Sequence, residues 1–145
     1  MTDHSKLSPG FSAPEAKILI VDDLPTDVKI ATEMIHPCGA QIYAALSGAQ
    51  AFEMVQNERY DLVFMDQIMP EMDGIETVSR IRSLADDDGY FHNLRIVVIT
   101  ASTLDGLEES FSSQGIDGFI TKPVNQEKLF EIIKKLLPAD KIIHP

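Results

Sequence analysis

Five short apolar segments alternate with longer segments of helical periodicity along most of this chain. The pattern predicts strands over 17–23, 41–46, 60–66, 94–100 and 118–121, and helices over 25–36, 47–58, 74–85, 104–114 and 125–137. Alternation of this kind builds right-handed βαβ units, which form a parallel sheet with helices packed against it. The first, third and fourth strand segments are apolar almost throughout, as expected when helices cover both sheet faces. We therefore expect an α/β fold with five parallel strands and five helices.

The domain organisation is simple. Residues 1–16 contain Ser, Pro and Gly without periodicity and are predicted to be a flexible tail. Residues 17–138 form the predicted domain, in which Ser47 and Asn125 are expected to be helix N-caps, and 139–145 form a C-terminal tail. The chain is 44% hydrophobic, which is ordinary for a protein with a packed core.

Polar residues follow the predicted strands at one edge of the sheet. Asp22 and Asp23 end the first strand, Asp66 ends the third, Thr100 ends the fourth and Lys122 follows the fifth. In open α/β sheets, ligands bind outside the carboxyl ends of the strands, where the strand order reverses. If the strand order is 2-1-3-4-5, the first and third strands are neighbours. Three carboxylates would then converge on one crevice, with a hydroxyl and an ammonium facing them.

This set of side chains is suited to phosphoryl transfer. Three clustered carboxylates raise one another's pKa, and a divalent cation relieves the repulsion. Mg²⁺ takes carboxylate oxygens together with waters and phosphate. Lys122 can pair with a phosphoryl oxygen, Thr100 can donate to another, and Asp66 can act as a nucleophile that forms an aspartyl-phosphate. Taken singly, each residue has an ordinary alternative: a helix cap or turn for an Asp, a satisfied hydroxyl for Thr100, a solvated lysine for Lys122.

Charge and cysteine content exclude several function classes. Twelve basic against 23 acidic residues give a net charge of −11, which argues against direct nucleic-acid binding and against an anionic membrane surface. No apolar run approaches the roughly 20 residues that span a bilayer, and no secretory signal begins the chain. Cys38 is the only cysteine, which rules out an internal disulfide and fits a cytoplasmic location.

The stretches KILIVDD, VFMDQIMPEMDG, VVITAS and FITKPV resemble the receiver domain of two-component response regulators, over about 17–137. The resemblance implies a flavodoxin-like, doubly wound sheet of order 2-1-3-4-5. It implies that Asp66 is the phosphorylated aspartate. It further implies that Asp23 ligates Mg²⁺ directly, Asp22 acts mainly through water, and the backbone carbonyl of Ile68 is another ligand.

The resemblance also assigns the parts of a switch. Thr100 would be the switch hydroxyl, with the small Ala101 after it, and Lys122 the phosphate-pairing lysine, joined to Pro123 by a cis peptide bond. Phe119 occupies the switch aromatic position. Phosphorylation would draw Thr100 toward the phosphate and let Phe119 turn inward. That change would reshape the face formed by the fourth helix, fifth strand and fifth helix, where a downstream protein binds.

The resemblance implies a phosphohistidine donor, on a sensor histidine kinase or a histidine phosphotransfer domain. No output domain is expected after the last helix, so the chain is read as the receiver of a hybrid sensor kinase or as a stand-alone receiver. The side chains two past Asp66 and two past Thr100 would flank the path of the hydrolytic water. Here they are Ile68 and Ser102, which predicts a long-lived phosphorylated form.

Two other classes compete with this interpretation. A phosphohydrolase similar to haloacid dehalogenases would need an acid two residues past Asp66, where this chain has Ile68. A degenerate receiver that only binds a partner would typically lack the acidic pair, the acceptor or the lysine, all of which are present. We therefore expect phosphorylation and dephosphorylation of the chain itself, without turnover of an external substrate.

Overall fold

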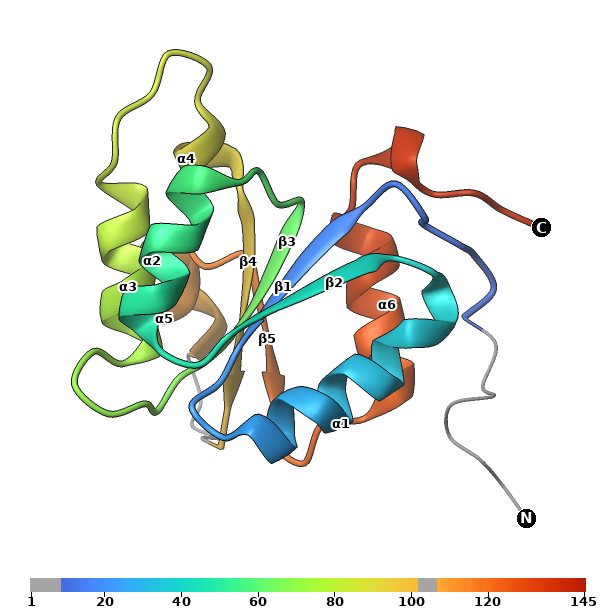
Figure 1. Cartoon of the computed structure of the whole chain (residues 1–145), viewed down its shortest axis with the longest axis horizontal. Coiled ribbons are helices and arrows are strands. Elements are labelled where there is room, and N and C mark those ends of the chain that lie inside the picture. Colours follow the sequence, from blue (N-terminus) through green and yellow to red (C-terminus); the bar gives the residue numbers. More distant parts are fainter. Residues whose placement is uncertain (1–8, 102–106) are drawn as a thin grey trace.

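The computed structural model describes residues 9–101 and 107–145, which form an α/β sandwich around one parallel sheet (Figure 1). Its strands are β1 (Lys17–Val21), β2 (Gln41–Ala45), β3 (Leu62–Asp66), β4 (Arg95–Thr100) and β5 (Gly118–Thr121). All neighbouring strands pair in parallel, in the order β2-β1-β3-β4-β5. The predicted fold class and strand order are confirmed.

The helices cover both faces of this sheet. They are α1 (Pro25–Ile35), α2 (Gly48–Asn57), α3 (Gly74–Arg82), α4 (Tyr90–Asn93), α5 (Leu107–Ser113) and α6 (Gln126–Leu136), with short 3₁₀ turns η2 (His36–Cys38) and η3 (Ala139–Lys141). Helices α1 and α6 lie on one side, whereas α2, α3 and α5 lie on the other (Figure 1). In the predicted helix over 104–114, residues 104–106 lie outside the described part of the chain, as does Ser102.

The prediction of five helices is wrong, because the described residues contain a sixth, α4. This helix is only four residues long, so it leaves no periodic signal in the sequence. The loop before it holds its first turn in place: the carboxylates of Asp86 and Asp88 accept hydrogen bonds from the Tyr90 N–H at 2.6 and 3.2 Å. Because α4 is additional, the predicted fourth and fifth helices are α5 and α6.

Helices α2 and α6 begin at the capping residues that the sequence predicts. Ser47 Oγ accepts from the Gln50 N–H at 3.0 Å, and Asn125 Oδ1 accepts from the Lys128 N–H at 3.1 Å. Both residues are N-caps, as predicted. The first strand ends at Val21, so Asp22 and Asp23 lie in the loop that leads to α1.

Alternation along the strands separates the core into two halves. In β1, Ile18 and Ile20 face the side covered by α1 and α6, whereas Leu19 and Val21 face the side covered by α2, α3 and α5. All four side chains are buried, as expected for a sheet covered on both faces. The two core clusters fill the space between sheet and helices, and polar residues lie at the carboxyl ends of β1, β3 and β4.

The segments around Ser12 and Ile143 meet beside α6. Within the predicted flexible tail, Phe11, Ala13 and Ala16 are buried, and the Phe11 ring meets the Phe130 ring edge-on with centroids 6.5 Å apart. Ser12 pairs with Ile143 through two backbone hydrogen bonds of 2.7 and 2.8 Å. This packing depends on isolated apolar residues among Ser, Pro and Gly, which carry no periodicity for sequence analysis to detect.

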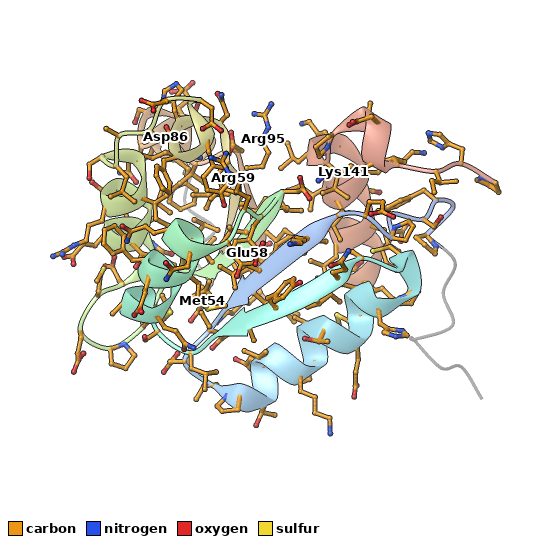
Figure 2. The ribbon with its side chains drawn as sticks, turned by 45° about the horizontal axis from the view of Figure 1, so that its top comes forward. Met54, Glu58, Arg59, Asp86, Arg95 and Lys141 are labelled. Carbon is orange, nitrogen blue, oxygen red and sulfur yellow. The ribbon has the colours of Figure 1, made fainter. Side chains whose placement is uncertain are left out.

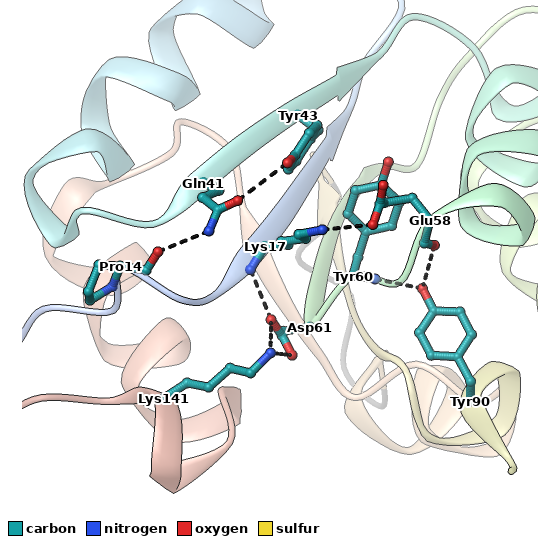
Figure 3. A network of polar contacts seen from close by, with 9 residues as sticks. All are labelled: Pro14, Lys17, Gln41, Tyr43, Glu58, Tyr60, Asp61, Tyr90 and Lys141. Carbon is teal, nitrogen blue, oxygen red and sulfur yellow. Dashed lines mark hydrogen bonds and ion pairs between the residues drawn. The ribbon is translucent and has the colours of Figure 1, made fainter.

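A polar network joins Lys17, at the start of β1, to Asp61 and Glu58 just before β3 (Figure 3). These are the amino ends of the two strands whose carboxyl ends lead to Asp22, Asp23 and Asp66. Asp61 accepts from the Lys17 backbone N–H at 2.9 Å and forms an ion pair with Lys141 at 2.9 Å. Other labelled charged side chains at this edge of the sheet include Arg59 and Arg95 (Figure 2). In the described ranges, no helix combines the length and apolar character needed to cross a bilayer.

Candidate functional site

Three carboxylates converge at the carboxyl edge of β1 and β3. Asp22 and Asp23 follow β1, and Asp66 is the last residue of β3, which pairs with β1. One carboxylate oxygen from each of the three residues lies within 4.8 Å of the others. The structure therefore brings together the acidic residues that the strand-end pattern singled out.

Asp22 is held in a poor environment for a negative charge. Its side chain is only 7% exposed, and this burial, together with the neighbouring carboxylates of Asp66 and Asp27, raises its pKa from 3.8 to about 6. The Leu24 N–H, which donates to Asp22 Oδ1 at 3.0 Å, opposes the rise. Without a cation, Asp22 is ionised at neutral pH only at a cost in stability.

Asp66 is buried beside the ammonium group of Lys122. It is 4% exposed, and burial raises its pKa above the usual range, although the Lys122 ammonium opposes this at 2.9 Å from Oδ1. Apart from this ion pair, Oδ1 has no hydrogen-bond partner among the described residues. The hydrogen bond to Asp66 in turn raises the pKa of Lys122, so the lysine is charged at neutral pH.

Backbone contacts set the position of Lys122 and of Thr100. The Lys122 N–H donates to the Thr100 carbonyl at 2.8 Å, and the Lys122–Pro123 peptide bond is cis, as predicted. Thr100 is 1% exposed at the end of β4, and its hydroxyl donates to Gln67 Oε1. Sequence analysis did not single out Gln67. Its position directly after Asp66, at the carboxyl edge of the sheet, was the available signal.

The loop from β3 to α3 fits closely around Asp66. A Cβ at position 74 would collide with the Asp66 carbonyl oxygen, so glycine is required where α3 begins. The Gly74 N–H donates to the Gln67 carbonyl at 2.8 Å, which fixes the loop ends. Between them, Ile68 projects outward with 73% of its surface exposed.

Phe119, on β5, lies against helix α5. Its half-buried ring meets the Phe111 ring edge-on, with centroids 5.7 Å apart and an interplanar angle of 72°. Ala101, the small residue after Thr100, is exposed. The predicted switch residues Thr100 and Phe119 therefore stand on the neighbouring strands β4 and β5.

The donor set fits Mg²⁺. All three clustered side chains offer hard carboxylate oxygens, which Mg²⁺ prefers over the nitrogen and sulfur ligands of softer metals. Two of the three are buried, and the Asp66 oxygen Oδ1 is paired with the Lys122 ammonium. Burial raises the pKa of Asp22 and of Asp66, and neighbouring carboxylates add to the rise; a divalent cation bound between these groups would stabilise their charged forms.

A parallel sheet with this acidic edge and a facing lysine defines a class of phosphoryl-accepting signalling domains. The model of the response regulator receiver domain family matches residues 18–134. The chain belongs to the receiver domain family of two-component systems, whose members are the phosphoacceptor domains of sensor kinases and response regulators.

Curated relatives include large sensor kinases. The chain is 31% identical over 132 residues to the sensor protein GacS of Pseudomonas syringae pv. syringae, covering 91% of this chain and 14% of that protein. It is 33% identical over 124 residues to hybrid signal transduction histidine kinase F of Dictyostelium discoideum, covering 86% of this chain and 11% of that protein. The chain thus spans only a small part of these relatives.

Solved structures agree with this assignment. Chemotaxis protein CheY4 of Vibrio cholerae matches with a TM-score of 0.75 and 26% identity, over 84% of this chain and 98% of CheY4. The receiver domain of sensor histidine kinase PA1611 from Pseudomonas aeruginosa matches with a TM-score of 0.73 and 26% identity, over 83% and 96% of the two chains. That structure holds a magnesium ion in its active-site cleft. Receiver domains bind Mg²⁺ at this site and pair with histidine kinases or phosphotransfer domains.

Proposed function

We propose that Asp66 accepts a phosphoryl group from a phosphohistidine donor in a Mg²⁺-dependent reaction. The observation that carries this proposal is the placement of Asp66, buried between two further carboxylates and 2.9 Å from the Lys122 ammonium. Burial raises the pKa of Asp66, so its carboxylate is a stronger base than a solvated one. A purely structural ion pair between Asp66 and Lys122 would not need the further carboxylates of Asp22 and Asp23 beside it. Together these features favour a nucleophile in a cation site.

The metal ligands in this proposal are Asp23 directly, Asp22 mainly through water, Asp66, and the backbone carbonyl of Ile68. When bound, Mg²⁺ would neutralise charge on the phosphoryl oxygens. The outward Ile68 side chain, 73% exposed, leaves its backbone as the part of the residue available to the site. Asp22 is more buried than Asp23, which agrees with a supporting role behind the direct ligand.

In the reaction, an Asp66 carboxylate oxygen bonds to phosphorus as the bond from phosphorus to the donor's imidazole nitrogen breaks. The electron pair of that bond stays on the ring nitrogen, and a proton carried on the other ring nitrogen of the phosphohistidine makes the leaving group neutral imidazole. Lys122 balances the charge that Asp66 gains and then pairs with the phosphoryl group. Thr100 supplies a hydroxyl donor from the neighbouring strand β4.

The output surface in this proposal is the face formed by α5, β5 and α6. Phosphorylation would draw Thr100 toward the phosphoryl group and free Phe119 to turn inward from its contact with Phe111. A pocket of about 480 Å³ lies on this face, lined by residues that include Phe111, Phe119, Ile132 and Lys135. A downstream protein that binds here would detect the position of Phe119.

The phosphodonor is expected to bind at the carboxyl ends of the strands, around the cluster of Asp22, Asp23 and Asp66. Of the five large exposed apolar side chains among the described residues, four lie on α1 or on the loops that follow β1, β2 and β3: Leu24, Ile30, Leu46 and Ile68. An apolar rim around a buried acceptor suits a sensor histidine kinase or histidine phosphotransfer domain. With a net charge of −11, direct binding of nucleic acid is not part of this function.

We further propose a cytoplasmic role, as the receiver of a hybrid sensor kinase or as a stand-alone receiver. The sensor kinases among the relatives support the first arrangement, and CheY4 the second. In either arrangement the chain modifies only itself and turns over no external substrate.

Acetyl phosphate tests the proposal without a cognate kinase. The chain should incorporate about one phosphoryl group in Mg²⁺ and almost none in EDTA, and Asp66→Asn should incorporate none, because an amide is a poor nucleophile. Undiminished labelling of Asp66→Asn would refute the acceptor assignment. Catalytic turnover of phosphate esters would instead favour a phosphohydrolase. This is disfavoured because Ile68 supplies no acid two residues past Asp66.

A further inference from the structure

We propose that Gln67 is a positioning residue that holds the Thr100 hydroxyl in the unphosphorylated protein and has to release it when Asp66 is phosphorylated. The inference rests on the proposed function, because it needs a phosphoryl group on Asp66. Its basis is the hydrogen bond that Thr100 donates to Gln67 Oε1.

The backbone around Gln67 makes this contact specific. Its N–H donates to the Ile99 carbonyl at 2.9 Å, and its carbonyl accepts from the Gly74 N–H at 2.8 Å. Both backbone groups are therefore used, and the residue stands at a fixed point between β4 and the start of α3. From there its carboxamide reaches the end of β4, where Thr100 is 1% exposed.

Competition follows from the number of protons available. A hydroxyl has one proton and donates one hydrogen bond, so Thr100 cannot donate to Gln67 and to a phosphoryl oxygen at once. A phosphoryl group on Asp66 adds several acceptor oxygens beside β4, and the Lys122 ammonium is already paired with Asp66 at 2.9 Å. The Thr100 proton must then leave Gln67 if it is to serve the phosphoryl group.

The Thr100 hydroxyl can turn from Gln67 to a phosphoryl oxygen without a movement of β4. The backbone carbonyl of Thr100 accepts from the Lys122 N–H at 2.8 Å, so the Thr100 backbone also holds the lysine in place. Rotation about χ1 redirects the hydroxyl while these backbone contacts persist. Gln67 is only half-buried, so water can replace Thr100 at its carboxamide. Gln67 thus stabilises the unphosphorylated position of the Thr100 hydroxyl by about the net free energy of one hydrogen bond.

Beryllium fluoride, a stable mimic of a phosphoryl group on aspartate, tests the assignment in Mg²⁺. Gln67→Met keeps the length of the side chain but cannot accept a normal hydrogen bond. We expect it to bind the mimic about fivefold more tightly than the wild type, which equals about 1 kcal/mol, the net value of a typical hydrogen bond. Gln56→Met is the matched control, because Gln56 is exposed on α2 and its carboxamide donates to the Phe52 carbonyl in its own helix. This control should bind as the wild type does.

A second background separates positioning from a general structural effect. In Thr100→Val, which keeps the side-chain shape but has no hydroxyl, Gln67→Met should leave the affinity unchanged. The role of Gln67 would be overturned if Gln67→Met raised the affinity for beryllium fluoride equally with Thr100 and with Thr100→Val, or raised it in neither. Gln67→Ala replaces Gln67→Met if the latter does not fold. Failure of the wild type to bind the mimic would overturn the proposed function itself, whereas wild-type binding with an unaltered Gln67→Met overturns only the Gln67 assignment.

Discussion

Replacing Asp22 by asparagine should stabilise the metal-free protein at neutral pH while removing part of its cation site. Burial and two neighbouring carboxylates raise the pKa of Asp22 from 3.8 to about 6. Asparagine has nearly the same shape, carries no charge, and can still accept from the Leu24 N–H at Oδ1. The variant therefore removes the cost of ionising a buried group and preserves the local hydrogen bond.

The size and sign of this effect follow from proton linkage. The folded protein keeps the Asp22 proton up to about pH 6, whereas the unfolded chain loses it near pH 3.8. Stability therefore falls as pH rises through this window. A difference of about two pKa units costs about 3 kcal/mol above the window, of which about 2 kcal/mol develops between pH 4.5 and pH 7.5.

Urea unfolding in EDTA at these two pH values measures the effect. Asp22→Asn should exceed the wild type by about 3 kcal/mol at pH 7.5 and by about 1 kcal/mol at pH 4.5. Added Mg²⁺ should stabilise the wild type more than the variant and narrow the gap. Asp87→Asn is the control, because it removes the same charge from an exposed loop position. A gain that is independent of pH, or one that Asp87→Asn reproduces, would refute the reasoning.

Three further perturbations test other parts of the molecule. Asp23→Ala should abolish the rise in melting temperature that Mg²⁺ causes in the wild type, and an unchanged rise would contradict the metal assignment. Phosphorylated wild type should decay slowly in Mg²⁺ and Ile68→Asn about tenfold faster, since a water-orienting contact is worth about 1.4 kcal/mol; a wild-type half-life of seconds would contradict this. Lys141→Met should lower the free energy of unfolding by about 0.5–1 kcal/mol, because it removes the partner of Asp61, and the loss should shrink in high salt.

The fold followed from the sequence because its signals are local and repeated. Apolar strand segments and N-caps such as Ser47 predicted the sheet and its helices, and parallel pairing then placed Asp22 and Asp66 at one edge. Helix α4 escaped detection because one turn has no period. The packing of Phe11 on Phe130 also escaped it, because a contact between residues far apart in the sequence has no counterpart in local patterning.

The candidate site was predictable to the level of residue type and strand end. The pattern identified Thr100 as a hydroxyl facing the acidic cluster, but not the partner that its proton has in the structure. That partner depends on how the Gln67 side chain turns from the end of β3, which no spacing rule specifies. Likewise, the rise in the pKa of Asp22 to about 6 depends on burial, which only the packed structure shows.

The most direct measurement is to locate the phosphoryl group on the chain. After incubation with a phosphohistidine donor in Mg²⁺, borohydride reduction converts an aspartyl-phosphate to homoserine, and peptide mass spectrometry identifies the modified position. We predict homoserine at position 66 alone, with none in EDTA or in Asp66→Asn. Modification at Asp22, at Asp23 or at a histidine, with residue 66 unchanged, would contradict the assignment of Asp66 as the phosphoacceptor.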